Sequence, residues 1–246
     1  MQTIITTSMS TITELPDDGR LAELRLLHLA DSALPIGALA HSFGMESLAD
    51  AGVLTPAGVA DFLHGYVEET GVMEAVFCRA AVDLRASPAF PSRRWVELNQ
   101  RLSARKPSRE SRAGSGALGW NFLLAVVGLG DFPALHQALA AAREAQTAVH
   151  HSLAFGLVAG LLGLEEERAV LAFLHQSLAG LISACQRLLP IGQSEATRIL
   201  WKLKPALIEA VARSRSYSVE DVPCFTPLLD WAAMEHPALT TRLFIS

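Results

Sequence analysis

The sequence predicts an all-α protein, a single bundle of about nine or ten helices. Apolar residues recur at helical spacing, for example at Val59, Phe62, Leu63, Tyr66 and Val67, as expected for one buried helix face. Alternating runs of β-branched residues and Asn-Gly or Asp-Gly hairpin turns do not occur between the apolar runs, so the sequence gives no signal for strands. Stretches rich in Ala and Gly at 138–142 and 156–163 predict core helices whose backbones approach their neighbours closely.

The first helix is expected from Leu21 and must end before Pro35, because the residue ahead of a proline avoids the helical region. A Pro-Ile-Gly turn follows, and a second helix is expected from about His41 and Ser42. Thr55 and Pro56 supply an N-cap and a first-turn proline for the next helix.

The remaining helices follow from similar stripes. The stripe from Met73 to Leu84 should end near Ala86, since Pro88 comes next. Negative charge at 165–167 suits the N-terminus of another helix. The other apolar stripes cover 95–102, 135–142, 153–164, 171–182 and 199–211.

Composition limits the class of protein. The chain has 246 residues, a net charge of -5 and 50% hydrophobic residues, which excludes a chain that is disordered throughout. We expect a disordered leader at 1–20 and one helical domain at 21–246. Three distant cysteines predict a reducing cytoplasm rather than a disulfide framework. The mild acidity argues against nucleic acid as a partner, and the apolar stretch 153–164 is too short to span a membrane.

One region, residues 93–112, is strongly basic. It has two acidic residues and seven basic ones: Arg93, Arg94, Arg101, Arg105, Lys106, Arg109 and Arg112. Two interpretations remain open, a solvated surface and a docking patch for an acidic partner.

Motifs for catalysis are weak. Residues 114–119 match GxGxxG, but a dinucleotide site needs a preceding buried strand, and the residues ahead are polar. His150 and His151 are adjacent, and side chains one residue apart on a helix point about 100° apart. We therefore predict no catalytic residue, no cofactor and no metal ligand. The alternative is a helical metal-dependent hydrolase with His41, Glu46 and either His150 or His151 as ligands.

Two segments have features that generic helix packing does not explain. In residues 31–46, Asp31, Ser32, His41, Ser42 and Glu46 cluster around one bend, where they can satisfy the unpaired groups of two helix ends. The last residues, 242–246, are mostly apolar, although chain ends are usually polar. We expect this tail to dock on its own domain or on a partner.

These segments resemble the urease accessory protein F family, UreF. The resemblance runs in order along the chain and rests on four groups of residues. They are Asp31, Ser32, Pro35, Gly37, His41, Ser42 and Glu46; Lys106, Arg109, Arg112 and Ser115; Arg187, Pro190 and Gly192; and 225–227 with His236 and 242–246. Leu39 and Gly114 depart from the family pattern, which commonly has an aromatic residue and alanine there.

The resemblance implies an all-α, dimeric, cytoplasmic maturation factor that is not an enzyme. It implies assembly with accessory protein D (also called H), with the GTPase accessory protein G and with apo-urease, which receives nickel, and control of GTP hydrolysis by protein G. A structural adaptor unrelated to urease is a further alternative.

The family's C-terminal region, here about 222–246, and its central loop are implicated in docking protein D. The resemblance therefore predicts partner binding by Lys106, Arg109, Arg112, Ser115, Arg242, Leu243, Phe244 and Ser246. We expect Arg242 to fix the tail by ion pairs or carbonyl hydrogen bonds, with Leu243 and Phe244 as apolar anchors.

Overall fold

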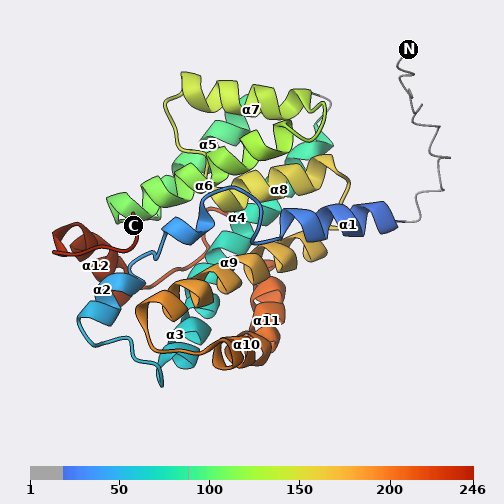
Figure 1. Cartoon of the computed structure of the whole chain (residues 1–246). Coiled ribbons are helices and arrows are strands. Elements are labelled where there is room, and N and C mark those ends of the chain that lie inside the picture. The colour runs from blue at the N-terminus through green and yellow to red at the C-terminus, as the bar shows by residue number, and fades with distance from the viewer. Residues whose placement is uncertain (1–18, 88) are drawn as a thin grey trace, which may run out of the picture.

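The computed structural model describes residues 19–87 and 89–246 (Figure 1), and all its regular elements there are helical. The all-α prediction is confirmed. Nine of the twelve α-helices in the described part have ten or more residues, which matches the expected number; α2, α3 and α12 are shorter. The predicted leader lies almost wholly outside the described residues, and Arg20 already begins α1. The predicted domain boundaries stay predictions.

The helices are α1 (Arg20–Leu29), α2 (Met45–Asp50), α3 (Val59–Tyr66), α4 (Val72–Val82), α5 (Ser92–Ala104), α6 (Arg109–Val127), α7 (Pro133–Glu144), α8 (His151–Leu161), α9 (Glu166–Leu188), α10 (Gln193–Lys202), α11 (Lys204–Ser214) and α12 (Pro227–Glu235). Four short helical segments complete them: η1 (Ala38–Ala40), η2 (Val67–Gly71), η3 (Asp83–Ala86) and η4 (His236–Ala238).

Helix α4 runs through the middle of the bundle, and its most extensive contact is with α8. Around this pair lie α5, α6 and α7 on one side and α9, α10 and α11 on the other, while α2 and α12 are neighbours near the C-terminus (Figure 1). Both α4 and α8 are buried along almost their whole length.

Glycines allow the α4–α8 contact. A Cβ on Gly156 would overlap the carbonyl oxygen of Cys78, and one on Gly160 would lie 2.6 Å from the carbonyl oxygen of Val82. Only a residue without a side chain fits such a separation. The interpretation of 156–163 as a core helix is correct up to Leu161, where α8 ends. The same interpretation of 138–142 is wrong, because this stretch lies in α7, which buries one face only.

Some helix boundaries differ from expectation. Helices α3 and α4 are joined without a break by η2, a π-helical turn. Thr55 caps a turn by accepting a hydrogen bond from the Gly58 N–H at 3.3 Å, and α3 itself begins at Val59. The stripe 199–211 is two helices, α10 and α11, because Pro205 opens a new helix directly after Leu203.

Helix α2 begins at Met45, three residues later than the expected start. Phe43 and Gly44 have φ angles of 51° and 92°, and this left-handed conformation cannot belong to a helix. The N–H groups of Ser42 and Phe43 point to the C-terminal tail instead.

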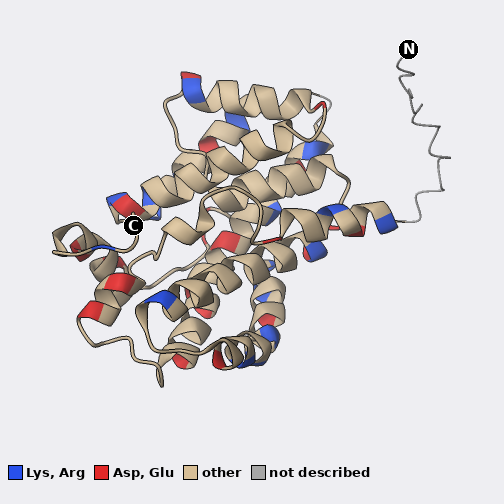
Figure 2. Cartoon of the chain, in the orientation of Figure 1, with Lys and Arg blue, Asp and Glu red and all other residues tan. Residues whose placement is uncertain are grey.

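Helix α9 is long and apolar enough to cross a membrane by length and composition, but more than half of its apolar window is buried by other helices. Such burial is typical of a core helix in a bundle. Acidic and basic side chains are interspersed over the molecule, and the start of α6, beside the C-terminus, carries both signs (Figure 2).

Candidate functional site

The two segments that generic helix packing does not explain contact each other. We call residues 31–46 the signature segment, residues 242–246 the tail, and their contact the tail junction. The Ser246 main-chain oxygen accepts hydrogen bonds from the N–H groups of Ser42 and Phe43, the latter at 3.1 Å. The Ile245 N–H donates to the Ala40 carbonyl at 2.8 Å. The tail therefore docks on its own chain along its main chain.

Side chains close the end of the junction. His41 Nδ1 lies 2.7 Å from the Ser246 hydroxyl, and both residues are buried. Burial lowers the pKa of His41, which favours the neutral imidazole. A Cβ on Gly114 of α6 would lie 2.8 Å from the Ser246 hydroxyl and 2.9 Å from His41 Nδ1. Glycine at this position gives the tail its space.

Glu46 is the hub of the junction. Its carboxylate accepts hydrogen bonds from the N–H groups of Leu243 at 2.6 Å and Phe244 at 3.1 Å. The same carboxylate lies 2.8 Å from His236 Nε2. Glu46 is only 5% exposed, so these bonds replace the hydrogen bonds to water that its carboxylate loses on burial.

A second carboxylate extends the network. The other ring nitrogen of His236, Nδ1, lies 2.6 Å from Glu110 Oε2, and Arg242 Nη1 lies 3.4 Å from Glu110 Oε1. His236 is fully buried, whereas Arg242 is 43% exposed. Arg242 thus forms the expected ion pair with the chain's own α6. No local pattern in the sequence pointed to Glu110.

Arg187 joins the tail to the signature segment from the end of α9. It donates to the Leu39 carbonyl at 2.6 Å and to the Leu243 carbonyl at 3.4 Å. Its guanidinium also lies 4.2 Å from the centre of the Phe244 ring, a cation–π contact.

The tail side chains alternate in exposure. Phe244 and Ser246 are buried, whereas Leu243 and Ile245 are 57% and 69% exposed. Phe244 is therefore an anchor inside this chain. Leu243 packs on nothing that buries it here and stays available to a partner.

The other signature residues shape turns. Asp31 accepts a hydrogen bond from the Ala33 N–H at 2.8 Å after α1 ends, and Ser42 Oγ accepts one from the Glu46 N–H at 3.4 Å. Gly37 has a φ of 84°, which glycine adopts without strain. Four further residues lie in connecting turns or start a helix: Ser32 and Pro35 between α1 and η1, and Pro190 and Gly192 between α9 and α10.

The basic segment is largely committed to its own chain. Lys106 forms an ion pair with Glu74 in which both side chains are about nine-tenths buried. Burial alone would raise the pKa of Glu74, but the Lys106 ammonium brings it below its usual value. Arg105 donates to three carbonyls between 219 and 222, and Arg112 to the carbonyls of 106 and 107.

This placement changes the interpretation of the central residues. Ser115 is 5% exposed and lies 3.1 Å from His150 Nδ1. Lys106 and Ser115 are therefore unavailable to a partner in this conformation. Arg109 is exposed at the start of α6 and Arg112 is partly exposed beside it, so partner contact there stays a prediction.

The alternative metal site is not assembled. His41 bonds Ser246, Glu46 bonds the tail, and His150 Nε2 lies 2.7 Å from the Ser103 hydroxyl. His151 packs among Phe122, Phe155 and Phe173. Within residues 19–87 and 89–246, no group of three or more His, Cys, Asp or Glu side chains is arranged to hold a metal ion.

Comparisons with known proteins find the same family as the resemblance. A family model described as UreF matches residues 53–204. A protein of Corynebacterium glutamicum (strain R) named "Urease accessory protein UreF" is 31% identical over 92% of this chain and 98% of its own length. Proteins of the same name from Picosynechococcus and Actinobacillus pleuropneumoniae serotype 5b are 31% and 29% identical over 92% and 90% of this chain, and over 100% and 97% of their own lengths.

Proposed function

This chain belongs to the UreF family of urease accessory proteins, and from that membership we propose that it bridges two other accessory proteins while nickel is inserted into apo-urease. The chain is a urease maturation factor, and its family is not catalytic. The partners in this proposal are accessory protein D (also called H), the GTPase accessory protein G and apo-urease, with nickel as the cargo of the complex. The bridge controls when protein G hydrolyses GTP.

The observation that supports this proposal is an apolar surface around the tail. Leu243 and Ile245 are exposed in the tail, and the C-terminus lies near α12 (Figure 1). On and before α12, four further apolar side chains are 46% to 78% exposed: Phe225, Leu228, Trp231 and Met234. Exposed apolar side chains gathered at one end of a molecule are typical of protein interaction sites. Aromatic residues such as these often dominate binding energy.

Hydrogen bonds and close packing hold this surface in position. The Phe225 N–H donates to Glu69 at 3.0 Å, and the Ser108 hydroxyl donates to the Ala233 carbonyl at 3.1 Å. A Cβ on Gly44 would lie 2.9 Å from the Ala233 nitrogen, so α12 rests directly on the signature segment. A rigid surface loses less entropy on binding than a mobile one. We assign this surface to protein D.

The test is a pull-down of protein D with the double variant Leu243→Ser, Ile245→Ser. We expect at least a tenfold loss of binding with unchanged helicity by circular dichroism, because both side chains are exposed in the free chain. The matched control is Trp201→Ser, Ile208→Ser on α10 and α11, which removes similarly exposed apolar side chains. Full binding by the tail variant, or equal loss in the control, would contradict the assignment.

Deletion of 242–246 is expected to abolish the pull-down and also urease activity in cells that co-express apo-urease and the other accessory proteins. Activity restored by the deleted chain would contradict the bridging role.

We also propose a homodimer through α1. Leu21, Leu24 and Leu27 on this helix are 46% to 69% exposed. Two copies of α1 that cross antiparallel at Leu24 would place these leucines against each other and Glu23 opposite Arg25 of the second copy, which is a self-complementary arrangement. Leu24→Glu should halve the mass measured by light scattering after size exclusion, whereas Val53→Glu, at a 54% exposed position after α2, should leave it unchanged. A dimer that survives Leu24→Glu would exclude α1 as the interface.

The cytoplasm is the compartment that fits this role. Cys78, Cys185 and Cys224 are all free thiols, as is usual for a protein of a reducing compartment.

A further inference from the structure

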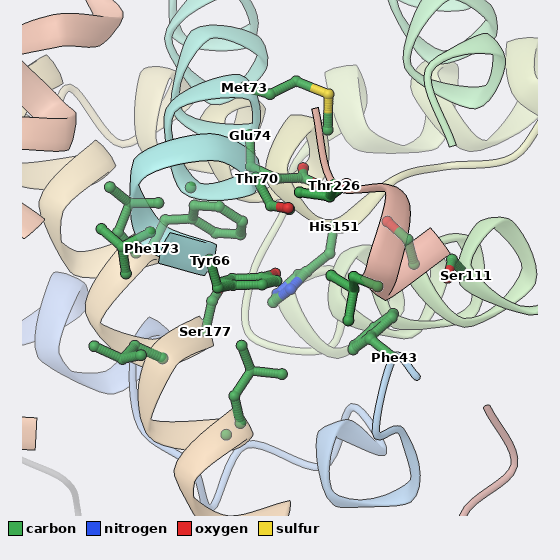
Figure 3. A pocket seen from close by; sticks show the side chains of 18 of the residues that line it. Phe43, Tyr66, Thr70, Met73, Glu74, Ser111, His151, Phe173, Ser177 and Thr226 are labelled. Carbon is green, nitrogen blue, oxygen red and sulfur yellow. The ribbon is translucent and has the colours of Figure 1, made fainter. Parts of the chain in front are cut away.

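A pocket of about 120 Å³ lies at the centre of the bundle, between α4, α6, α8, α9 and α12. Figure 3 shows side chains from these helices and from the signature segment around it, among them Tyr66, Glu74 and His151. Phe43, Met73 and Phe173 supply apolar walls. An apolar cavity of about 150 Å³ binds benzene, and this pocket is somewhat smaller, so a ligand here can have no more than one small ring.

Three buried polar atoms on the pocket lining have no hydrogen-bond partner within the described part of the protein. They are Glu74 Oε2, His151 Nε2 and Gln176 Oε1. The Ser152 hydroxyl is near enough to Glu74 to lower the pKa of this carboxyl, but it makes no hydrogen bond of normal geometry to Oε2. Each of the three residues is only 8% exposed. A buried polar atom left without a partner costs about 1 to 3 kcal/mol. Three such atoms at one cavity indicate a ligand that supplies the missing bonds.

The chemistry of these atoms selects the ligand. Glu74 Oε2 and Gln176 Oε1 accept hydrogen bonds, and a neutral imidazole nitrogen donates or accepts according to its tautomer. Two acceptors beside one adaptable group match a head group with two N–H donors and one acceptor. A primary carboxamide has these groups and carries no charge.

The charge of the lining favours an uncharged ligand. The negative charge of Glu74 is already balanced by Lys106, which bonds its other oxygen. Burial lowers the pKa of His151 to about 4, so its imidazole is neutral at neutral pH. The Asp230 carboxyl also lines the pocket, and burial raises its pKa. An anionic ligand would lose its hydration beside two carboxyl groups, and a cationic ligand would meet only the Asp230 carboxyl, whose burial favours the neutral form.

The backbone beside the pocket is also unusual. Val67, Thr70 and Gly71 line the pocket and belong to η2, the π-helical turn between α3 and α4. Such turns are rare, widen a helix locally and occur frequently at functional sites. This observation is independent of the unpaired atoms.

We propose that this pocket binds a small neutral molecule that joins a primary carboxamide to one compact apolar ring. The amide N–H groups face Glu74 and Gln176, and the amide oxygen faces His151. The ring packs against Phe43 and Phe173. This site lies apart from the exposed faces of the tail and α12, so it does not depend on the role in urease maturation.

Benzamide and benzoate test the proposal on the full chain by isothermal titration calorimetry. The two probes have the same shape, but benzoate presents only acceptors and a negative charge. Benzamidinium is a third probe of the same shape, which presents only donors and a positive charge. We expect saturable 1:1 binding of benzamide and at least tenfold weaker binding of benzoate and of benzamidinium. No saturable binding of benzamide would overturn the proposal, since water alone then serves the three atoms. Equal or tighter binding of either charged probe would overturn the ligand class.

Variants test whether benzamide binds in this pocket. His151→Leu and Gln176→Leu each remove one unpaired atom and change the side-chain volume only slightly, so the fold is expected to persist. Each should weaken benzamide at least tenfold. The control is Gln137→Leu on the exposed face of α7, which should bind benzamide as the parent chain does. Unchanged affinity in both pocket variants, with folding verified by circular dichroism, would show that benzamide binds elsewhere.

Discussion

The α4–α8 contact and the tail junction hold the molecule together by different means. In the first, glycines bring two buried helices to within backbone contact, and no charged group takes part at Gly156 or Gly160. In the second, two carboxylates, two histidines and two arginines hold a tail that has only one deeply buried apolar side chain, Phe244. Close apolar packing tolerates no change of shape. A polar network can open and close again, which suits a tail that meets a partner.

The largest effect is expected at the α4–α8 contact. Gly156→Ala places a methyl group against the Cys78 carbonyl oxygen, and we expect a loss of about 4 kcal/mol or more in the free energy of unfolding, or failure to fold. Gly180→Ala is the matched control, since nothing lies within 4 Å of its Cβ position on α9. It should stabilise the protein by about 0.5 to 1 kcal/mol. Equal effects of the two changes in urea unfolding would contradict the packing argument.

The next effect opens the tail junction. Glu46→Gln removes the charge that meets His236 and weakens both bonds to the tail, and it should cost about 3 kcal/mol. The Leu243 and Phe244 amides should lose their protection against hydrogen exchange, while amides of α4 and α8 keep theirs. Asp50→Asn on the exposed end of the same helix is the control and should leave both unchanged. A protected tail in Glu46→Gln would show that Glu46 is not the hub.

A lower pH should destabilise the protein through two buried histidines at the start of α8, His150 and His151. Burial lowers the pKa of His150 to about 3 and that of His151 to about 4, against 6.5 for a free histidine. Because the folded state resists protonation, their contribution is complete above pH 6.5 and is lost as the pH falls below it. Between about pH 7.5 and about pH 5.5 we expect a loss of about 2 to 3 kcal/mol in the free energy of unfolding.

His151→Phe should remove about half of that pH dependence, whereas His136→Gln on the exposed face of α7 should not change it. Stability that is flat between these pH values in the parent chain would contradict the burial of neutral imidazoles.

The smallest effect on stability is expected for the exposed ion pair at the edge of the tail junction. Arg242 is 43% exposed and lies 3.4 Å from Glu110, and such surface pairs contribute about 0 to 1 kcal/mol. Arg242→Ala should therefore lower stability by less than that limit and leave the tail amides protected. A loss in the free energy of unfolding as large as that of Glu46→Gln would show that Arg242, and not Glu46, is the hub of the network.

The helical faces could be predicted from the sequence because burial follows a local period. Trp95, Leu98 and Leu102 were expected on one face, and all three are fully buried. The docking of the tail on its own chain was among the expected outcomes. The signature segment was expected to satisfy helix ends, but His41 and Glu46 bond the tail instead. The contact between the two segments was not predicted, because it joins residues from opposite ends of the chain and no local pattern encodes such a pairing.

Charge was a poorer guide than periodicity. The count of basic residues at 93–112 suggested a surface patch, but Lys106 enters the interior to pair with Glu74, and Arg105 binds carbonyl groups of a distant loop. Net charge records how many ionised groups a segment has and does not show which of them have a partner. The roles in partner binding stay predictions for the same reason, since a partner's surface is not written in this sequence.

Gly114 links two positions that lie more than half the chain apart. Its missing side chain leaves the space that the Ser246 hydroxyl and His41 occupy. In a relative with alanine at the first position, the terminal residue must retreat or shrink. Substitutions at 114 and 246 are therefore expected to covary among relatives. That covariation would show which relatives place residue 246 in the same space beside α6.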